Sequence, residues 1–207
     1  MSQVDAGSAN YDHFAQKRHR HFYDNWKMNA FDSALKHTLG IEGDFSDDPA
    51  DSGGATKWGI TESVARAFGY SGPMQDMPVS LAQSIYLQNY WELLKLNVIS
   101  MLSEDIALEI FDTGVNCGVG FAGQSLQRAL TAFNRNGRDY PDLVVDGLVG
   151  RMTHTALRAF LDKRGLDGEM VLLRALNCLQ GARYIQLVEN RPKDERFIYG
   201  WFLNRVK

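Results

Sequence analysis

The sequence predicts a mainly α-helical fold with one small β-hairpin. Apolar residues recur at helical spacing over most of the 207 residues, whereas strand patterns are confined to the short stretch 55–61. Polar residues typical of helix starts, and glycines and prolines typical of helix ends, divide the helical pattern into segments. A chain of this length buries roughly 70% of its unfolded surface, so it can form a core without disulfides or metals.

The composition and charge are those of a globular protein. Apolar residues make up 44% of the chain and charged residues 23%, and the formal net charge is −3. This balance excludes a polycation that coats nucleic acid through its overall charge. Cys117 and Cys178 form no CxxC pair and have no histidine at metal-ligand spacing. We therefore expect neither a metal nor a cofactor, and the two cysteines leave a single disulfide open.

Residues 1–28 are interpreted as a basic and aromatic N-terminal extension. A basic tract, Lys17–His21, lies between Phe14 and Trp26. One interpretation is a helical or frayed segment with a solvated basic face. The other is a surface, residues 14–27, that contacts anionic lipid, lipopolysaccharide or wall phosphate. Nucleic acid is not expected as a partner. We find no secretion signal and no apolar run of membrane-spanning length, so cytoplasmic synthesis is expected.

The first structural elements are expected on either side of a polar loop. Phe31 and Leu35 begin a helical stripe that is expected to end near Gly40. A loop rich in glycine, aspartate and proline follows. The segment 55–61 (ATKWGIT) then predicts one short hairpin directly after a Gly-Gly turn.

Capping residues predict where the next helices begin. Thr61 and Ser103 are each expected to cap a helix N-terminus. Ser80 with Gln83 forms a capping-box pattern that predicts a helix over residues 81–94. A turn at residues 118–120 is expected before the following helix.

Turn residues and prolines divide the rest of the chain. Residues 134–143 have turn chemistry throughout, and three helical patterns follow, separated at Gly165–Gly168 and at Pro192. Leucines in the first two patterns predict a helix-packing core, so this part is expected to pack on the preceding region. The expected helical patterns are 151–164, 168–189 and 193–205. The expected parts are an extension (1–28), a catalytic region (29–134), a connector (135–145) and a helical region (146–207).

The loop from Glu42 to Thr61 carries the residues that indicate chemistry. Five carboxylates and no basic residue lie between positions 41 and 51, and such crowding raises carboxyl pKa values. A calcium loop is excluded, because Pro49 and Ala55 stand where that loop needs a glycine and a bidentate glutamate. Glu42 follows the apolar face of a helix whose macrodipole disfavours an acid at that end. It is therefore either a solvated helix end or a general acid with a raised pKa.

The loop resembles a known signature. Glu42-Gly43, eight residues, Asp51 and then Gly53–Thr61 (GGATKWGIT) are similar to the EGG…D-x-GGAT-x-x-GIT pattern of glycoside hydrolase family 108. Members of that family are N-acetylmuramidases of phages and bacteria. The order also resembles the Glu–Asp–Thr triad of tailed-phage lysozymes, where the threonine comes one residue later. Asp44 departs from the family pattern, which usually has a second glycine there.

Further blocks extend the resemblance to about residues 29–207. Asp112–Gly118 (DTGVNCG) with the following LQRAL resembles the family's D-x-x-x-N-x-G block. Asp146–Gly150 (DGLVG) resembles the opening of its C-terminal peptidoglycan-binding-like region, and Gly200–Val206 (GWFLNRV) resembles its GW-x-x-RV close. The resemblance implies a lysozyme-like helical fold with the small β-hairpin beside the active-site loop.

The resemblance implies three catalytic residues. Glu42 is expected to be the general acid that protonates the departing oxygen. Asp51 is expected either to orient water or to stabilise positive charge, and its alternative is a turn-forming aspartate. Thr56 is expected to hold the attacking water, and its alternative is an ordinary strand threonine. If Asp51 and Thr56 act opposite Glu42, the reaction inverts the anomeric centre.

Three further residues are candidates for substrate binding. Trp58 is expected to stack on a sugar face, as Tyr90 or Trp91 would, although Trp91 is favoured as a core residue. Asn116 is expected either to hydrogen-bond an N-acetyl group or to form a left-handed helix cap. Asp112 lies one helical turn before Asn116, within reach of that residue or of substrate.

The implied function is a glycosidase of the lysozyme type that hydrolyses peptidoglycan. It would cut the β-1,4 bond between N-acetylmuramic acid and N-acetylglucosamine as a monomer, with Glu42 as the acid and without a metal or cofactor. A phage endolysin, bacteriolytic and released to the cell wall through a holin, fits the expected cytoplasmic synthesis. The alternative is a non-catalytic wall-binding or secretion-associated protein of the same family.

Overall fold

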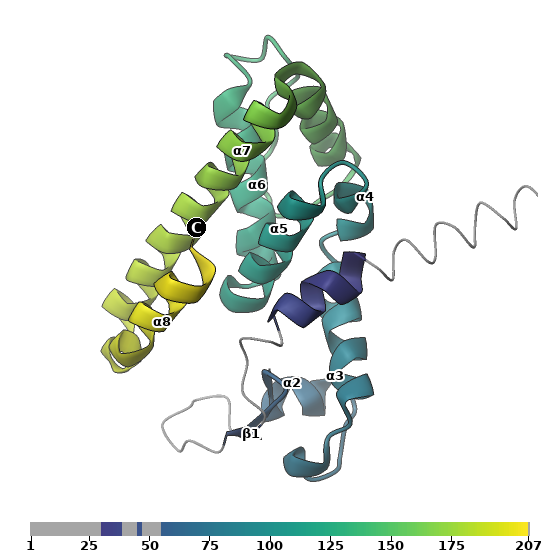
Figure 1. Cartoon of the computed structure of the whole chain (residues 1–207), viewed down its shortest axis with the longest axis vertical. Helices are drawn as coiled ribbons and strands as arrows, with labels where there is room; N and C mark the ends of the chain where they lie inside the picture. The colour runs from purple at the N-terminus through teal and green to yellow at the C-terminus, as the bar shows by residue number, and fades with distance from the viewer. Residues whose placement is uncertain (1–29, 39–44, 47–54, 207) are drawn as a thin grey trace, which may run out of the picture.

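The chain folds into a mainly α-helical structure, as its sequence predicts (Figure 1). The computed structural model describes residues 30–38, 45–46 and 55–206. Residues 30–38 are helical. The later elements are β1 (Phe45–Ser46), β2 (Thr56–Lys57), β3 (Ile60–Thr61), α2 (Glu62–Ala67), η1 (Met74–Asp76), α3 (Val79–Tyr86), η2 (Leu87–Trp91), α4 (Leu96–Ser100), α5 (Glu104–Cys117), α6 (Val119–Phe133), α7 (Arg151–Asn190), η3 (Pro192–Asp194) and α8 (Glu195–Arg205).

The expected hairpin is present, and it belongs to a slightly larger sheet. Strands β2 and β3 pair antiparallel with Lys57 opposite Ile60, so Trp58 and Gly59 form a two-residue turn. Both turn residues have positive φ, 54° and 71°, which is the pattern of a type I′ turn. Strand β1 adds to β2 as a third, antiparallel strand that the sequence did not predict.

Two of the three predicted helix caps are confirmed. The Thr61 hydroxyl accepts a hydrogen bond from the Val64 amide, and the Ser103 hydroxyl accepts one from the Ile106 amide at 3.0 Å. The capping-box prediction at Ser80 is wrong. Helix α3 begins at Val79 behind Pro78, whose carbonyl already accepts from the third and fourth following amides. The fixed φ of proline suits a helix start, so the helix begins before Ser80.

The helix expected over residues 81–94 is interrupted. After α3 one π-helical turn, η2, is closed by the Glu92 amide donating to the Leu87 carbonyl at 2.9 Å. Lys95 then takes a left-handed conformation with φ 53°, and α4 begins beyond it. The extra residue per turn in a π-helix shifts the register of the side chains that follow.

The C-terminal helices follow the predicted divisions closely. Helix α7 is kinked at Gly165, which has φ 57° and ψ −148°. Helix α8 follows η3, which begins at Pro192. The turn expected at residues 118–120 is shorter than predicted, because Gly118 alone separates α5 from α6. Asp139, in the segment before α7, forms ion pairs with Arg135 and Lys163.

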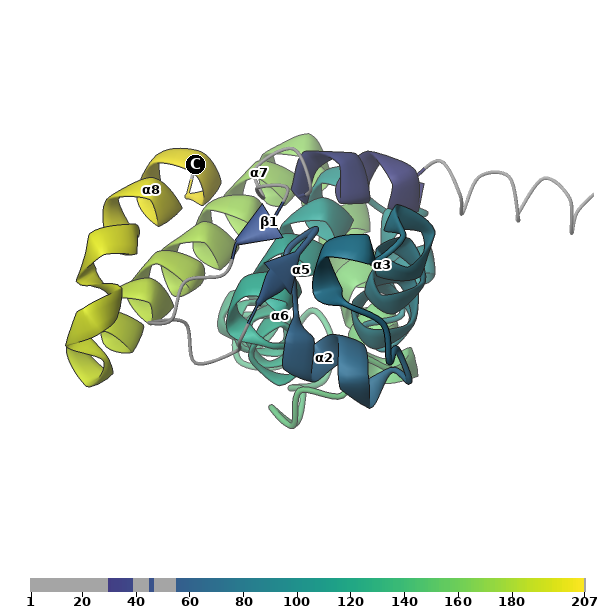
Figure 2. The same ribbon diagram turned by 90° about the horizontal axis from the view of Figure 1, so that it is seen from below.

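One hydrophobic cluster joins these elements. It extends from Ala30 to Leu176 and includes residues of α3, α5, α6 and α7. Helix α5 packs against both α6 and α7, and α8 packs on the C-terminal half of α7. The small sheet and α2 lie at the end of the molecule opposite the α6–α7 connection (Figures 1 and 2). No helix in the described part of the chain is both long enough and apolar enough to span a membrane.

Candidate active site

The two predicted catalytic carboxylates, Glu42 and Asp51, lie outside the residues that the structure describes. The extension 1–28 lies outside them as well. The structure does describe the helical residues 30–38 before the acidic loop, which we define as residues 39–54, and strand β2 after it. These elements determine where the loop leaves the core and where it returns.

The helix before the acidic loop is fixed by aromatic contacts. The Phe31 ring lies 5.5 Å from the Trp91 ring and 6.1 Å from the Phe111 ring, and both contacts are edge-to-face. The Trp91 and Phe111 rings are themselves 5.7 Å apart. Such pairs contribute about 0.5–1.5 kcal/mol each beyond the area that they bury. Trp91 is therefore a core residue, in agreement with the favoured interpretation.

Thr56 lies after the acidic loop on strand β2, opposite Ser46 and Thr61. This position is the strand position that the sequence predicted for it. The hairpin turn is anchored through Trp58. The Tyr86 hydroxyl donates to the Trp58 carbonyl at 3.1 Å, and the Trp58 indole donates to the Met77 carbonyl at 3.0 Å. Thr56 is half-buried on this strand.

The Trp58 side chain is partly committed to the protein. Its indole nitrogen is bonded to Met77, and the Lys57 ammonium lies 4.6 Å from the ring centroid. The residue also holds a left-handed conformation that is costly for a bulky side chain. Its proposed role in stacking on a sugar stays a prediction.

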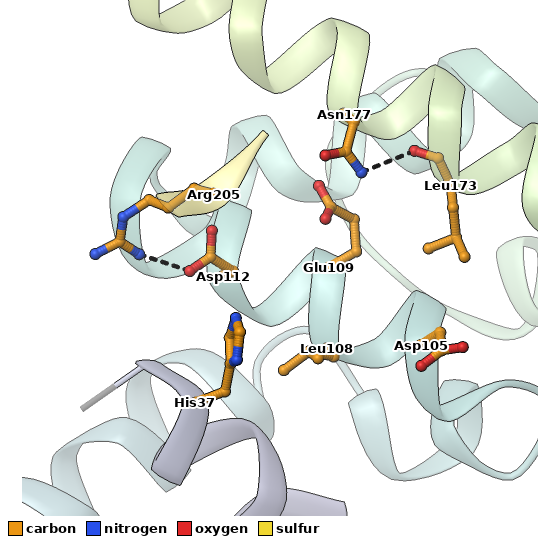
Figure 3. Close-up of a pocket in the computed structure, with 8 residues that line it drawn as sticks. All are labelled: His37, Asp105, Leu108, Glu109, Asp112, Leu173, Asn177 and Arg205. Carbon is orange, nitrogen blue, oxygen red and sulfur yellow. Dashed lines mark hydrogen bonds and ion pairs between the residues drawn. The ribbon is translucent and has the colours of Figure 1, made fainter. Parts of the chain in front are cut away.

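Asp112 is buried, and protein groups bind both of its carboxylate oxygens. Figure 3 shows its contact with Arg205. Oδ1 accepts from Arg205 Nη1 at 2.6 Å and from Asn116 Nδ2 at 3.2 Å, while Oδ2 accepts from Gln180 Nε2 at 2.8 Å. Asp112 thus connects α5 with α7 and α8. A substrate contact through this carboxylate stays a prediction, and it would have to compete with these donors.

Asn116 is turned back onto its own helix. Its side-chain amide donates to the Asp112 carbonyl at 2.7 Å as well as to the Asp112 carboxylate. The alternative of a left-handed cap at Asn116 is wrong, because the positive φ, 93°, belongs to Gly118. With its amide nitrogen engaged, the carbonyl oxygen of Asn116 is the group that remains to meet a donor such as an N-acetyl N–H.

A small polar cavity lies beside Asp112. It has a volume of about 130 Å³ and lies between helical residues 30–38, α5, α7 and the end of α8 (Figure 3). Sites that enclose a small-molecule ligand usually measure about 300–1,000 Å³, so this cavity is too small for a disaccharide. Its polar walls suit a few water molecules or a single polar group. The lining residues are His37, Asp105, Leu108, Glu109, Asp112, Leu173, Asn177 and Arg205.

Burial suppresses ionisation of two groups near Asp112. Burial is the main cause that raises the pKa of the Cys117 thiol to about 12, and it also raises the pKa of the Tyr184 hydroxyl. Cys117 is therefore a protonated thiol near neutral pH and a poor nucleophile. Cys117 and Cys178 are both free, so they do not form the disulfide that the sequence left open. Within the described ranges no three His, Cys, Asp or Glu residues form a metal-binding group.

Sequence reasoning did not identify the partners of Asp112. Gln180 and Arg205 lie 68 and 93 residues away along the chain. Arg205 does fall in the GWFLNRV motif at the end of the chain. That motif was the only sequence signal that could have drawn attention to it.

The chain matches two family models over adjacent segments. Residues 35–118 match the model described as glycosyl hydrolase 108, and residues 122–206 match the model described as a predicted peptidoglycan domain. All six predicted site residues fall within the first match. The boundary between the matches lies at the start of α6.

A solved structure shares the fold. SagA of Brucella abortus is 21% identical, and the likeness covers 84% of this chain and 87% of that chain with a TM-score of 0.59. This likeness confirms the predicted fold class. No curated protein shows significant sequence similarity to the chain. Residues 35–118 of this chain are therefore similar to the glycosyl hydrolase 108 family, and residues 122–206 are similar to a predicted peptidoglycan domain.

Proposed function

We propose that the protein is an N-acetylmuramidase that cleaves the β-1,4 bond between N-acetylmuramic acid and N-acetylglucosamine. The observation that carries this proposal is the pairing of a glycosyl hydrolase 108 region with a peptidoglycan domain in one chain. The two matches support a peptidoglycan hydrolase, and the EG…D-x-GGAT pattern within the first match supplies the residues for glycosidic cleavage.

In the proposed mechanism, residues near the start of the acidic loop and residues near its end have different catalytic roles. Glu42 protonates the oxygen of the departing sugar, since glycoside cleavage requires a general acid. Asp51 and the Thr56 hydroxyl orient a water molecule on the opposite face of the sugar ring. This arrangement requires a carboxyl separation of about 6.5–9.5 Å and gives inversion at the anomeric carbon. The position of Thr56 on β2, paired with both β1 and β3, supports its part in this scheme.

The remaining candidates are proposed to contact the glycan around this centre. Trp58 would offer an aromatic surface beside Thr56, and the Asn116 carbonyl would accept from an N-acetyl group. Residues 14–27 are proposed to contact anionic components of the cell envelope, and a bacteriolytic endolysin is the proposed biological role.

Mass spectrometry of the fragments released from purified sacculi tests the bond specificity. We expect muropeptides with reducing-end N-acetylmuramic acid. Anhydro ends would instead indicate a lytic transglycosylase, and free stem peptides would indicate an amidase; either product pattern would overturn the muramidase assignment.

The role of Glu42 is tested in the same assay with Glu42→Gln. Because the amide cannot donate the proton, we expect the release rate to fall by about a hundredfold or more. Glu92→Gln is the matched control, since Glu92 is an exposed glutamate of the same region, and it should release fragments at the wild-type rate. Wild-type release by Glu42→Gln would contradict the assignment.

A further inference from the structure

A basic pocket lies between α4 and the first two turns of α7. It is defined by Lys95, Arg151, His154 and Arg158 together with an apolar wall, and its volume is about 470 Å³. Helix α4 lies in the segment matched by glycosyl hydrolase 108 and α7 in the segment matched by the peptidoglycan domain (both labelled in Figure 1). The lining residues of the pocket therefore come from both matched segments. It is separate from the polar cavity beside Asp112.

The basic side chains of α7 share one face of the helix. Arg151, His154 and Arg158 are spaced three and four residues apart, which places them in a row along α7. The core-facing side of the same turns carries Ala156 and Leu157, both of which are buried. The row therefore faces outward toward α4, where Lys95 stands in its left-handed conformation at the start of the helix.

No described carboxylate pairs with the cations of the basic pocket. In the described part of the chain, Lys95, Arg151 and Arg158 form no ion pair, and no carboxylate lines the pocket. Elsewhere in the same region, Arg135 and Lys163 are both paired with Asp139. Three positive charges around one hollow repel one another, and an anion bound between them would relieve that repulsion.

Two further features of the pocket suit an anion. The Nε2 atom of His154 is buried and makes no hydrogen bond to any described residue. Gly150, which precedes α7, provides no side-chain cap, so the first amides of this long helix add partial positive charge at the pocket. Both features favour an anionic group with hydrogen-bonding oxygens.

The acidic neighbour Asp146 does not compensate the charge of Arg151. Arg151 also borders a second hollow that contains Asp146. Asp146 Oδ1, however, accepts from Gln127 Nε2 and from the Leu148 amide, both at 2.8 Å, and forms no ion pair with Arg151 within the described residues. These hydrogen bonds lower the pKa of Asp146 and hold its carboxylate against Gln127 of α6 and the Leu148 amide.

The walls of the basic pocket indicate what kind of anion fits. Val98, Leu102 and Val149 contribute an apolar surface beside the cations. Guanidinium groups bind carboxylates through two parallel hydrogen bonds, and an apolar wall suits methyl groups. The stem peptide of peptidoglycan combines alanine methyl groups with free carboxylates. The pocket volume lies within the usual range for small-molecule sites, so it can accept the end of such a peptide.

We propose that the basic pocket binds the carboxylate end of a peptidoglycan stem peptide, with Arg151, Arg158 and Lys95 as its cations. The proposal rests on the proposed function, because it takes peptidoglycan as the substrate. The bound stem would bridge the glycosyl hydrolase region and the peptidoglycan domain, and it would fix the position of the glycan strand that carries it.

Binding of a tetrapeptide stem to the full chain tests the proposal without requiring hydrolysis. Isothermal titration would compare wild type, the double variant Arg151→Gln/Arg158→Gln and the matched control Arg128→Gln/Arg174→Gln. The control removes two exposed arginines of α6 and α7 that do not line the pocket. We expect affinity to fall about tenfold or more in the pocket variant and to stay unchanged in the control. The same peptide with amidated carboxylates should also lose affinity for the wild type, by at least as much as the unmodified peptide loses in the pocket variant.

The outcomes separate this proposal from the muramidase assignment. Equal binding by the pocket variant and the wild type, or equal binding of the amidated peptide, would overturn the stem-peptide site. Tighter binding of a phosphate polymer that displaces the peptide would overturn it in favour of a phosphate site. If the peptide binds as expected but sacculi release no reducing-end N-acetylmuramic acid, only the muramidase assignment fails. Circular dichroism of each variant checks that the fold is retained.

Discussion

Asp112 connects three helices through a single carboxylate. Its partners, Gln180 and Arg205, come from α7 and α8, and the ion pair with Arg205 is almost fully shielded from water. Removing one member of a buried pair leaves an uncompensated charge, which costs far more than losing an exposed pair. The carboxylate that the sequence marked as a substrate ligand therefore also has a structural function.

The Asp112–Arg205 pair predicts a large loss of stability in Arg205→Met. The variant leaves the Asp112 charge buried without its cation, so we expect the free energy of unfolding to fall by about 3–5 kcal/mol. Urea denaturation followed by circular dichroism measures this change. Arg191→Met is the matched control, because the Arg191 side chain is 49% exposed and its pair with Asp194 should be worth about 1 kcal/mol or less. Equal losses in the two variants would show that the Asp112 pair is not a buried link.

Helix caps formed by neighbouring residues were predictable from the sequence, whereas side-chain contacts between residues far apart in the chain were not. The Thr61 and Ser103 caps involve amides three residues away, so their pattern is visible in sequence. The pairing of Asp112 with Arg205 depends on how α5, α7 and α8 pack, and no spacing encodes it. The six candidate site residues were found through a family resemblance. The basic pocket was missed because Lys95 and Arg151 meet only in the folded chain.

At the scale of elements, helix boundaries depended on competition between neighbouring signals. Ser80 carries a capping-box pattern, but Pro78 starts the helix two residues earlier. Strand β1 is two residues long and gives no alternation to detect. The π-helical turn η2 is only five residues long, so its pattern of apolar side chains cannot be distinguished from that of an α-helix. Gly165, in contrast, was correctly expected to interrupt the helical pattern.

The kink at Gly165 predicts an unusual response to alanine. A φ of 57° with a ψ of −148° lies in a region that is essentially restricted to glycine, so Gly165→Ala should lower the free energy of unfolding by about 1–3 kcal/mol. Gly120→Ala is the control, because Gly120 lies inside α6, a Cβ there meets no atom within 4 Å, and alanine favours helix by up to about 1 kcal/mol. Thermal unfolding should shift in opposite directions for the two variants. If Gly165→Ala were as stable as wild type, the backbone conformation at the kink would not require glycine.

At the scale of the molecule, the two matched regions share one core. The hydrophobic cluster contains Phe31 and Trp91 from the glycosyl hydrolase region together with Leu130 and Leu172 from the peptidoglycan domain. Helix α5 of the first region packs directly on α6 and α7 of the second. The boundary between the family matches is therefore not a boundary between separate hydrophobic cores.

A shared core predicts that both regions unfold in one cooperative transition. Trp91 reports on the first region, where it packs against Phe111, and Trp201 reports on the second, where its ring lies 5.2 Å from the Tyr184 ring. In protein labelled with 5-fluorotryptophan, the native ¹⁹F signals of both residues should disappear at the same urea concentration. Trp201→Phe identifies the second signal. Loss of the Trp201 signal at a distinctly lower urea concentration, while Trp91 remains native, would mean that the peptidoglycan domain unfolds independently. In that case α5 would hold the second region only by a weak surface contact, and the Asp112–Arg205 pair could not contribute to the stability of the first.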